Sequence, residues 1–179
     1  MKSFQEIKKI LPIFSLNIYK NEQTIFLSQK HLLFCILNLK KHINWQYSVL
    51  SCISGVDFLT SQYRFSIVYD FLSLINNSRL RLKIFVNEVS IVSSIVGIYK
   101  NANWWEREIW DLYGLYFKNH PDLRRILTDY GFEGFPMRKD FPLSGYVELR
   151  YDPTKKRIII EPIELAQDFR NFVFETPWL

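Results

Sequence analysis

Two runs of alternating apolar and polar side chains, with a polar turn between them, constrain the fold of this chain more than any other feature. Apolar side chains recur at every second position in residues 63–71 and again in residues 80–86. Residues 76–78, Asn-Asn-Ser, lie between the runs and are typical of a turn. Because successive side chains of a β-strand point to opposite faces, the two runs predict an antiparallel hairpin with one buried face.

The rest of the amino-terminal part predicts one helix and two further strands. Residues 28–41 carry apolar side chains at helical spacing, with Ser28 as the expected N-cap. Residues 47–56 and, more briefly, residues 24–27 predict strands. We therefore expect an α+β fold, in which a mainly antiparallel sheet carries helices on one face and an extended carboxy-terminal arm follows.

The last part of the chain shows no helical period and is rich in proline and glycine. Only residues 147–151 and 157–160 predict short strands, joined by an Asp-Pro turn. The segment carries too many aromatic rings for free disorder. We therefore divide the chain into an α+β domain, residues 1–127, and an extended partner-wrapping arm, residues 128–179. The alternative is that this segment folds back over its own sheet.

A second helix is expected in residues 103–114, which read NWWEREIWDLYG. Asn103 is the expected N-cap, and Glu106 follows three residues later, as in a capping box. Gly114 suits the left-handed position after the last turn. Glu108 lies inside the apolar face of this helix, where a buried carboxylate is costly unless it is paired.

Two arginines and a network of charges are expected around this helix. Arg124 or Arg125 is the expected partner of Glu108, because the residues from His120 onward predict a short helix nearby. Arg107 can also pair with an acidic residue one turn away, Asp111. We interpret these charges as a structural ion-pair network.

Other classes of function are weighed against this structural interpretation. An acid–base or metal cluster of Glu106, Glu108 and Asp111 would make the chain a small hydrolase, but such chemistry needs a cleft. The net charge of +5 and the pI of about 9.1 are compatible with RNA, yet the basic residues are scattered. An organellar RNA-binding or ribosomal protein is therefore the main alternative.

Cofactor, metal and membrane signals are weak throughout the sequence. Its 2 cysteines and 3 histidines show no metal-ligand spacing, and no glycine-rich dinucleotide loop is present. No apolar run reaches the roughly 18 residues needed to cross a bilayer. We expect no catalytic, cofactor-binding or metal-binding residues.

Several short sequence motifs in the second half of the chain resemble those of a known family, the 30-kDa subunit of respiratory complex I. The matching strings are residues 106–108 (ERE), 111–114 (DLYG), 120–127 (HPDLRRIL), 136–143 (PMRKDFPL), 145–151 (GYVELRY), 161–162 (EP) and 177–178 (PW). The structural signature residues are Glu106, Arg107, Glu108, Asp111, Gly114, His120, Arg124 and Arg125.

The resemblance implies a structural, cofactor-free core subunit of the quinone module in the peripheral arm. The whole complex passes electrons from NADH to ubiquinone and pumps protons, with FMN, iron–sulfur clusters and ubiquinone in partner subunits. The implied partner is chiefly the large quinone-site subunit, with no nucleic acid and with membrane association only through the complex. The implied location is the matrix side of the mitochondrial inner membrane.

The arm and the signature helix are expected to supply the interface with that partner. The expected interface residues are Trp105, Trp110, Phe135, Arg138, Lys139, Phe141, Tyr146, Arg150 and Trp178. Residues 1–11 make a poor presequence, and the composition favours A/T-rich codons. We therefore expect a mitochondrion-encoded copy, with a bacterial or chloroplast homologue as the nearest alternative.

Overall fold

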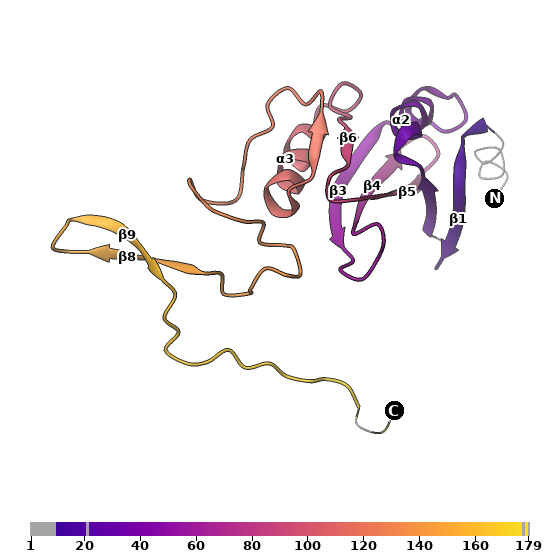
Figure 1. Ribbon diagram of the computed structural model, residues 1–179. Helices are drawn as coiled ribbons and strands as arrows, with labels where there is room; N and C mark the ends of the chain where they lie inside the picture. The colour runs from indigo at the N-terminus through magenta and orange to yellow at the C-terminus, as the bar shows by residue number, and fades with distance from the viewer. Residues whose placement is uncertain (1–9, 21, 177, 179) are drawn as a thin grey trace. The chain divides into compact units, whose positions relative to one another are not determined.

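Five strands pair in the order β1-β2-β5-β4-β3 in the computed structural model, which describes residues 10–20, 22–176 and 178 (Figure 1). The strands are β1 (Ile13–Tyr19), β2 (Glu22–Leu27), β3 (Val49–Asp57), β4 (Phe65–Ser73) and β5 (Ser78–Val86). The predicted hairpin is β4 and β5, paired antiparallel from Phe65 opposite Val86 to Ser73 opposite Ser78.

The sheet is mixed but mainly antiparallel, as expected. β1 pairs antiparallel with β2, and β3 pairs antiparallel with β4, whereas β2 and β5 run parallel. β1 was not predicted from the sequence, whereas the predicted bounds of β2 and β3 lie within two residues of those observed. The α+β class is confirmed.

The helices cover one face of this sheet, also as expected. The 3-10 turn η1 (Gln29–His31) leads into α2 (Leu32–Lys41), and α3 (Ala102–Tyr113) lies beside β3 (Figure 1). One core cluster joins the inward side chains of both α-helices to those of the sheet. Ser28 takes the N-cap position of η1, as expected, but only its carbonyl caps: it accepts the His31 amide, and the Ser28 side chain bonds to no helix amide.

Two three-residue strands tie distant parts of the first unit together. β6 (Ile91–Ser93) pairs in parallel with β7 (Tyr116–Lys118). They bracket α3, so both the entry to the helix and the exit from it are held by one short ladder.

The chain divides into two compact units after Asp140. The second unit contains β8 (Val147–Asp152) and β9 (Arg157–Pro162), an antiparallel hairpin that confirms the two predicted strands. The predicted boundary lay after residue 127, whereas residues 128–140 cluster with the first unit. Residues 1–9, which make up most of the segment of the presequence prediction, and Pro177 of the matching string 177–178 lie outside the described residues.

Candidate functional site

The candidate site is α3 together with the loop that follows it, because the signature residues gather there. Gly114 ends the helix in the left-handed conformation, with φ 75°, and its amide bonds to the Trp110 carbonyl. The expected Asn103 cap is wrong. The N-cap lies two residues earlier, at Asn101, and the Asn101 side chain donates to the Leu50 carbonyl of β3 at 2.8 Å rather than to the helix.

The buried carboxylate of the helix is Glu106 and not the expected Glu108. Glu106 is fully buried, whereas Glu108 is only partly buried and no arginine pairs with it in the described residues. Glu106 Oε1 accepts the Ile95 amide at 2.7 Å. The side chain therefore faces the core, where it binds a loop amide, and does not cap its own helix. Burial raises the pKa of Glu106 to about 7, opposed by hydrogen bonds from Ser94 and Ile95.

His120 lies against this carboxylate. Its Nε2 is 3.9 Å from Glu106 Oε2 and 3.2 Å from the Asn103 carbonyl, and both side chains of the pair are fully buried. His120 Nδ1 accepts the Asp122 amide at 3.1 Å. Because Nδ1 accepts this amide, Nε2 is the ring nitrogen left to face Glu106 and the Asn103 carbonyl. Glu106 Oε2 has no hydrogen-bond partner in the described part of the chain.

Asp111 is the second fully buried carboxylate, and it organises the loop after the helix. Its Oδ2 accepts the amides of residues 126, 127 and 128 at 3.1, 2.7 and 2.8 Å. Its Oδ1 accepts the Thr128 hydroxyl at 2.6 Å and Arg125 Nη1 at 3.2 Å. Burial alone would raise the pKa of Asp111, but the bonds from Thr128 and the loop amides outweigh it and lower the pKa.

The arginines therefore take partners other than those expected. Arg125 pairs with Asp111 rather than Glu108, and Arg124 pairs with Asp122 at 2.9 Å. Arg107 does not pair with Asp111, because it donates to the carbonyls of Arg124 and Arg125. The expected short helix after His120 does not form, since Asp111 takes the amides that would bond within it.

Residues 135–138 close over the end of the helix. Arg138 Nε donates to the Tyr113 carbonyl at 2.8 Å, and the Met137 amide donates to the Leu112 carbonyl at 3.1 Å. The Phe135 ring packs so near Gly114 that a Cβ there would lie 2.6 Å from it. Glycine at position 114 is therefore required both by its φ and by this contact.

A second charged cluster, which was not predicted from the sequence, fastens this loop to the sheet. Asp57 is buried and accepts Arg64 Nε at 3.0 Å and the Lys139 amide at 2.9 Å. Arg64 also bonds to Asp140 at 2.8 Å. Burial opposes but does not outweigh these donors, so the pKa of Asp57 is lowered. The sequence does hold a signal for this pair, because Asp57 ends β3 and Arg64 directly precedes β4.

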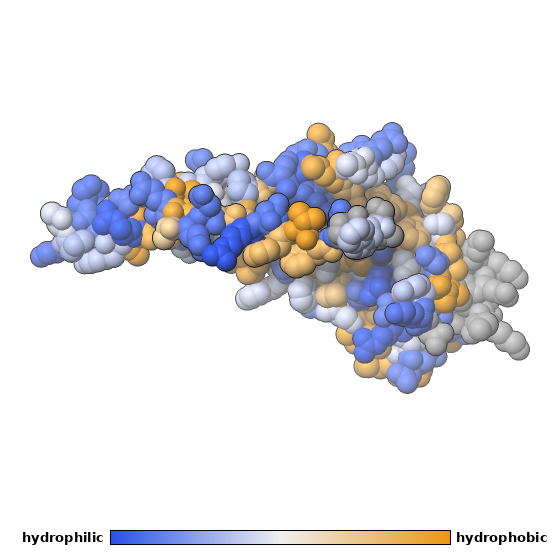
Figure 2. Space-filling view, turned by 90° about the horizontal axis from the view of Figure 1, so that it is seen from below, coloured by the Kyte–Doolittle hydropathy of each residue, from blue (hydrophilic) through white to orange (hydrophobic). Residues whose placement is uncertain are grey.

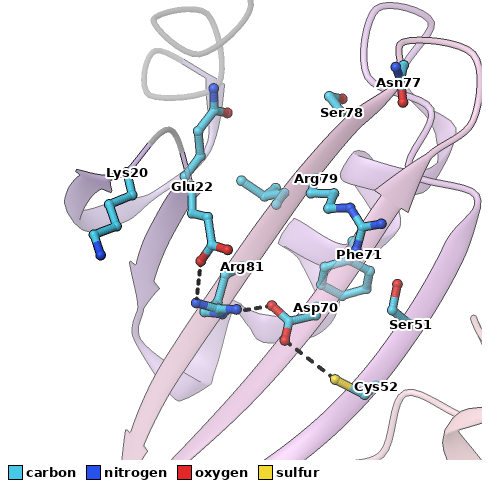
Figure 3. A pocket seen from close by; sticks show the side chains of 12 residues that line it. Lys20, Glu22, Ser51, Cys52, Asp70, Phe71, Asn77, Ser78, Arg79 and Arg81 are labelled. Atoms are coloured by element: carbon cyan, nitrogen blue, oxygen red, sulfur yellow. Dashed lines mark hydrogen bonds and ion pairs between the residues drawn. The ribbon is translucent and has the colours of Figure 1, made fainter.

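The outer face of the sheet carries a separate hollow of about 550 Å³ (Figure 3). In it Arg81 lies between Glu22, at 2.9 Å, and Asp70, at 2.8 Å. The Cys52 thiol donates to Asp70 at 3.4 Å. The charged and polar side chains that line the hollow therefore pair with one another across β2, β5, β4 and β3. We interpret them as cross-strand pairs that stabilise the sheet rather than as a reaction centre.

The expected interface residues fall into two groups. In the first unit, Trp105 packs against the core, and Trp110, Phe135 and Arg138 contact one another or their neighbours. The remaining expected residues lie in or next to the second unit and are Lys139, Phe141, Tyr146, Arg150 and Trp178.

The acid–base alternative has no accessible pair of carboxylates on the helix. Glu106 and Asp111 are fully buried and engaged by amides, which leaves only Glu108 open to a substrate. Within residues 10–20, 22–176 and 178, no three His, Cys, Asp or Glu side chains gather as metal ligands would.

Residues 25–147 match the family described as respiratory-chain NADH dehydrogenase, 30 Kd subunit. The chain is 53% identical over 159 residues to NADH-ubiquinone oxidoreductase subunit 9 of Reclinomonas americana, covering 89% of this chain and 78% of that protein. It is 49% identical over 160 residues to the protein of the same name from Prototheca wickerhamii, covering 89% and 83%.

A plant relative carries a different name. The chain is 56% identical over 146 residues to NADH dehydrogenase (ubiquinone) iron-sulfur protein 3 of Beta trigyna, covering 82% of this chain and 75% of that protein. The family match at residues 25–147 includes β3, β4 and β5, α3 and the loop fastened by Asp111.

Proposed function

Because the chain belongs to the family of the 30-kDa subunit of the respiratory-chain NADH dehydrogenase, we propose that it acts as a cofactor-free scaffold within that enzyme. It is a core subunit of the quinone module of complex I, the mitochondrial NADH–ubiquinone oxidoreductase. The oxidoreductase activity belongs to the assembly. The main alternative, an RNA-binding or ribosomal protein, finds no support among the relatives.

The observation that carries the scaffold proposal is the apolar surface of the second unit. Most of its large apolar side chains are at least half exposed, and Val147, Tyr151, Ile158, Phe169, Phe174 and Trp178 range from 52% to 93% exposed. Apolar side chains reach the surface beside hydrophilic ones in Figure 2. Apolar surface on this scale is typical of a protein interface. We therefore assign the arm to a partner, chiefly the large quinone-site subunit.

The word iron-sulfur in the name of the Beta relative does not fit the residues of this chain. A cluster held by one chain needs four cysteine thiolates, or histidines in their place. The sequence has 2 cysteines, and Cys35 is fully buried in α2, where burial raises its thiol pKa to about 11. Two cysteines, one of them a buried neutral thiol, are too few for a cluster held by this chain alone. We propose that FMN and quinone also lie in partner subunits.

The location follows from the partners. None of the helices in the described residues is long and apolar enough to span a bilayer. We place the subunit on the matrix side of the mitochondrial inner membrane, held there by the complex that pumps protons through its other subunits.

The arm proposal is tested by removing exposed rings from it while the chain stays at full length. We expect the triple variant Phe169→Ser, Phe172→Ser and Phe174→Ser to fold normally but to be lost from the NADH-oxidising assembly on native gels. The matched control changes three large apolar side chains of the first unit that are also mostly exposed, Phe14, Ile43 and Val89, to serine. Normal assembly of the arm variant would contradict a partner-wrapping arm.

A further inference from the structure

An apolar groove of about 340 Å³ opens beside α3, outside the charged cluster described above. Trp104, Trp105 and Glu108 form its helix side, and Ile126 and Leu127 form the opposite wall. Trp104 is 69% exposed and Leu127 62% exposed. Two tryptophans and two aliphatic side chains around one opening make an exposed surface that favours a protein partner.

The groove is rigid on both sides. The helix side is fixed by the packing of Trp105 and Ile109 against the core. The opposite wall is fixed because Asp111 holds the amides of Ile126 and Leu127 at 3.1 and 2.7 Å. A surface that is already ordered loses little conformational entropy when a partner docks. The buried Asp111 therefore serves to build this groove.

Glu108 is the feature that selects the occupant. It is the one charged side chain of the lining, and no hydrogen bond or ion pair joins it to another side chain in the described residues. A partner that covered the groove would strip water from this carboxylate, which is unfavourable unless the partner supplies a donor. An anionic lipid surface would be repelled here, and a neutral apolar segment would leave the carboxylate unpaired.

We propose that this groove docks a segment of a neighbouring complex I subunit that presents an arginine to Glu108 and an apolar side chain to Ile126 and Leu127. Arginine fits because its planar guanidinium can pair with the carboxylate and also stack on the exposed Trp104 ring. The proposal rests on the proposed function, which supplies the class of partner. It adds a second contact region, separate from the arm.

Charge reversal at Glu108 tests the pairing in the intact complex. Glu108→Arg should lower the amount of chain in the assembled complex by about tenfold or more, since two facing cations repel each other where a pair stood. Glu108→Gln should have a smaller effect. The matched control is Glu133→Arg, an exposed glutamate of the first unit. The purified Glu108→Arg chain should melt at the wild-type temperature, because Glu108 has no partner within the described chain to lose.

Hydroxyl-radical footprinting of the wild type tests coverage of the groove without any substitution. Labelling of Trp104 should fall about tenfold on assembly into the complex, relative to the free full-length chain. Unchanged labelling of Trp104, normal assembly of Glu108→Arg, or protection of Trp104 by anionic vesicles alone would overturn the proposal. Absence of the wild-type chain from any NADH-oxidising assembly would overturn the proposed function first, and this proposal with it.

Discussion

Two carboxylates of α3 are equally buried, yet their surroundings drive their protonation in opposite directions. Glu106 receives few donors, and its pKa is raised to about 7. Asp111 receives a hydroxyl, a guanidinium and three amides, and its pKa is lowered. Burial favours the neutral acid, whereas donors favour the anion, so the balance between burial and donors decides the direction of each pKa shift. The Asp111 carboxylate therefore holds the loop as an anion, whereas Glu106 makes the stability of the chain sensitive to pH.

Replacement of Glu106 by glutamine should change how stability depends on pH. The folded chain keeps the Glu106 proton up to about pH 7, whereas the unfolded chain releases it near pH 4.5. The Glu106 contribution to stability is therefore lost as pH rises between these values. We expect the unfolding free energy of Glu106→Gln, relative to wild type, to rise by about 3 kcal/mol from about pH 4 to about pH 8.

Urea denaturation of the purified full-length chain at several pH values measures this difference. Each variant is compared with wild type at every pH, so constant effects of the amide cancel. Glu133→Gln, at an exposed position, serves as the control and should give a difference that does not vary with pH. A flat profile for Glu106→Gln would show that the folded chain does not retain this proton.

The helical period located the charged face of α3 but not which carboxylate is buried. On a helical wheel Glu108 falls among apolar side chains, yet Glu106 faces the core. What decides this is the Ile95 amide, which comes from a loop outside the helix and needs an acceptor. Asp111 is similar, because its partners lie 14 to 17 residues after it in the chain, beyond the end of the helix. Contacts of this kind have no local sequence signal.

Among the elements, the contact of α3 with β3 depends on a single glycine. A Cβ on Gly55 would lie 2.6 Å from the Tyr113 ring. That ring cannot retreat freely, because the Tyr113 hydroxyl donates to the Gly55 carbonyl at 2.8 Å and the ring meets Phe65 edge-on. The absence of a side chain in β3 therefore sets the distance between helix and sheet.

Substitution of Gly55 by alanine should lower the free energy of unfolding by about 1–3 kcal/mol, because the added methyl overpacks this contact. Gly97→Ala is the matched control, since nothing lies within 4 Å of a Cβ there and the change should stay within about 0.5 kcal/mol. Chemical denaturation of the two purified variants measures both values. Equal stability of the variants would show that Tyr113 is free to move.

Two hairpins could be predicted from the sequence, because in each of them the pairing partner follows closely in the chain. The alternation of β4 and β5 and the turn between them are visible in the sequence, and so is the hairpin of β8 and β9. β6 and β7 were missed because each has three residues and pairs with a partner across α3. The fastening of residues 137–140 to Tyr113 and Asp57 was missed for the same reason, which is why the unit boundary lies after Asp140.

At the scale of the whole molecule, the two units differ in how they bury apolar side chains. The first unit has one core cluster in which residues such as Ile25, Tyr69 and Leu82 are fully buried. In the second unit the strand residues Val147, Leu149 and Ile160 stay more than half exposed. The first unit is therefore stabilised by its own core, whereas the exposed apolar side chains of the second unit are suited to an interface with a partner.

This division predicts different hydrogen-exchange rates for the two hairpins. An isolated two-stranded hairpin is marginally stable in water, and β8 and β9 have no third strand within the described residues. In the free full-length chain, we expect amides of β8 and β9 to exchange quickly and those of β4 and β5 slowly. In the assembled complex, exchange in β8 and β9 should slow by more than about tenfold, because unfolding of the hairpin must first break the interface.

Hydrogen exchange followed by mass spectrometry measures both the free chain and the complex, with β4 and β5 as the internal control. Slow exchange of β8 and β9 in the free chain would mean that the arm is stable by itself and does not need a partner to become ordered.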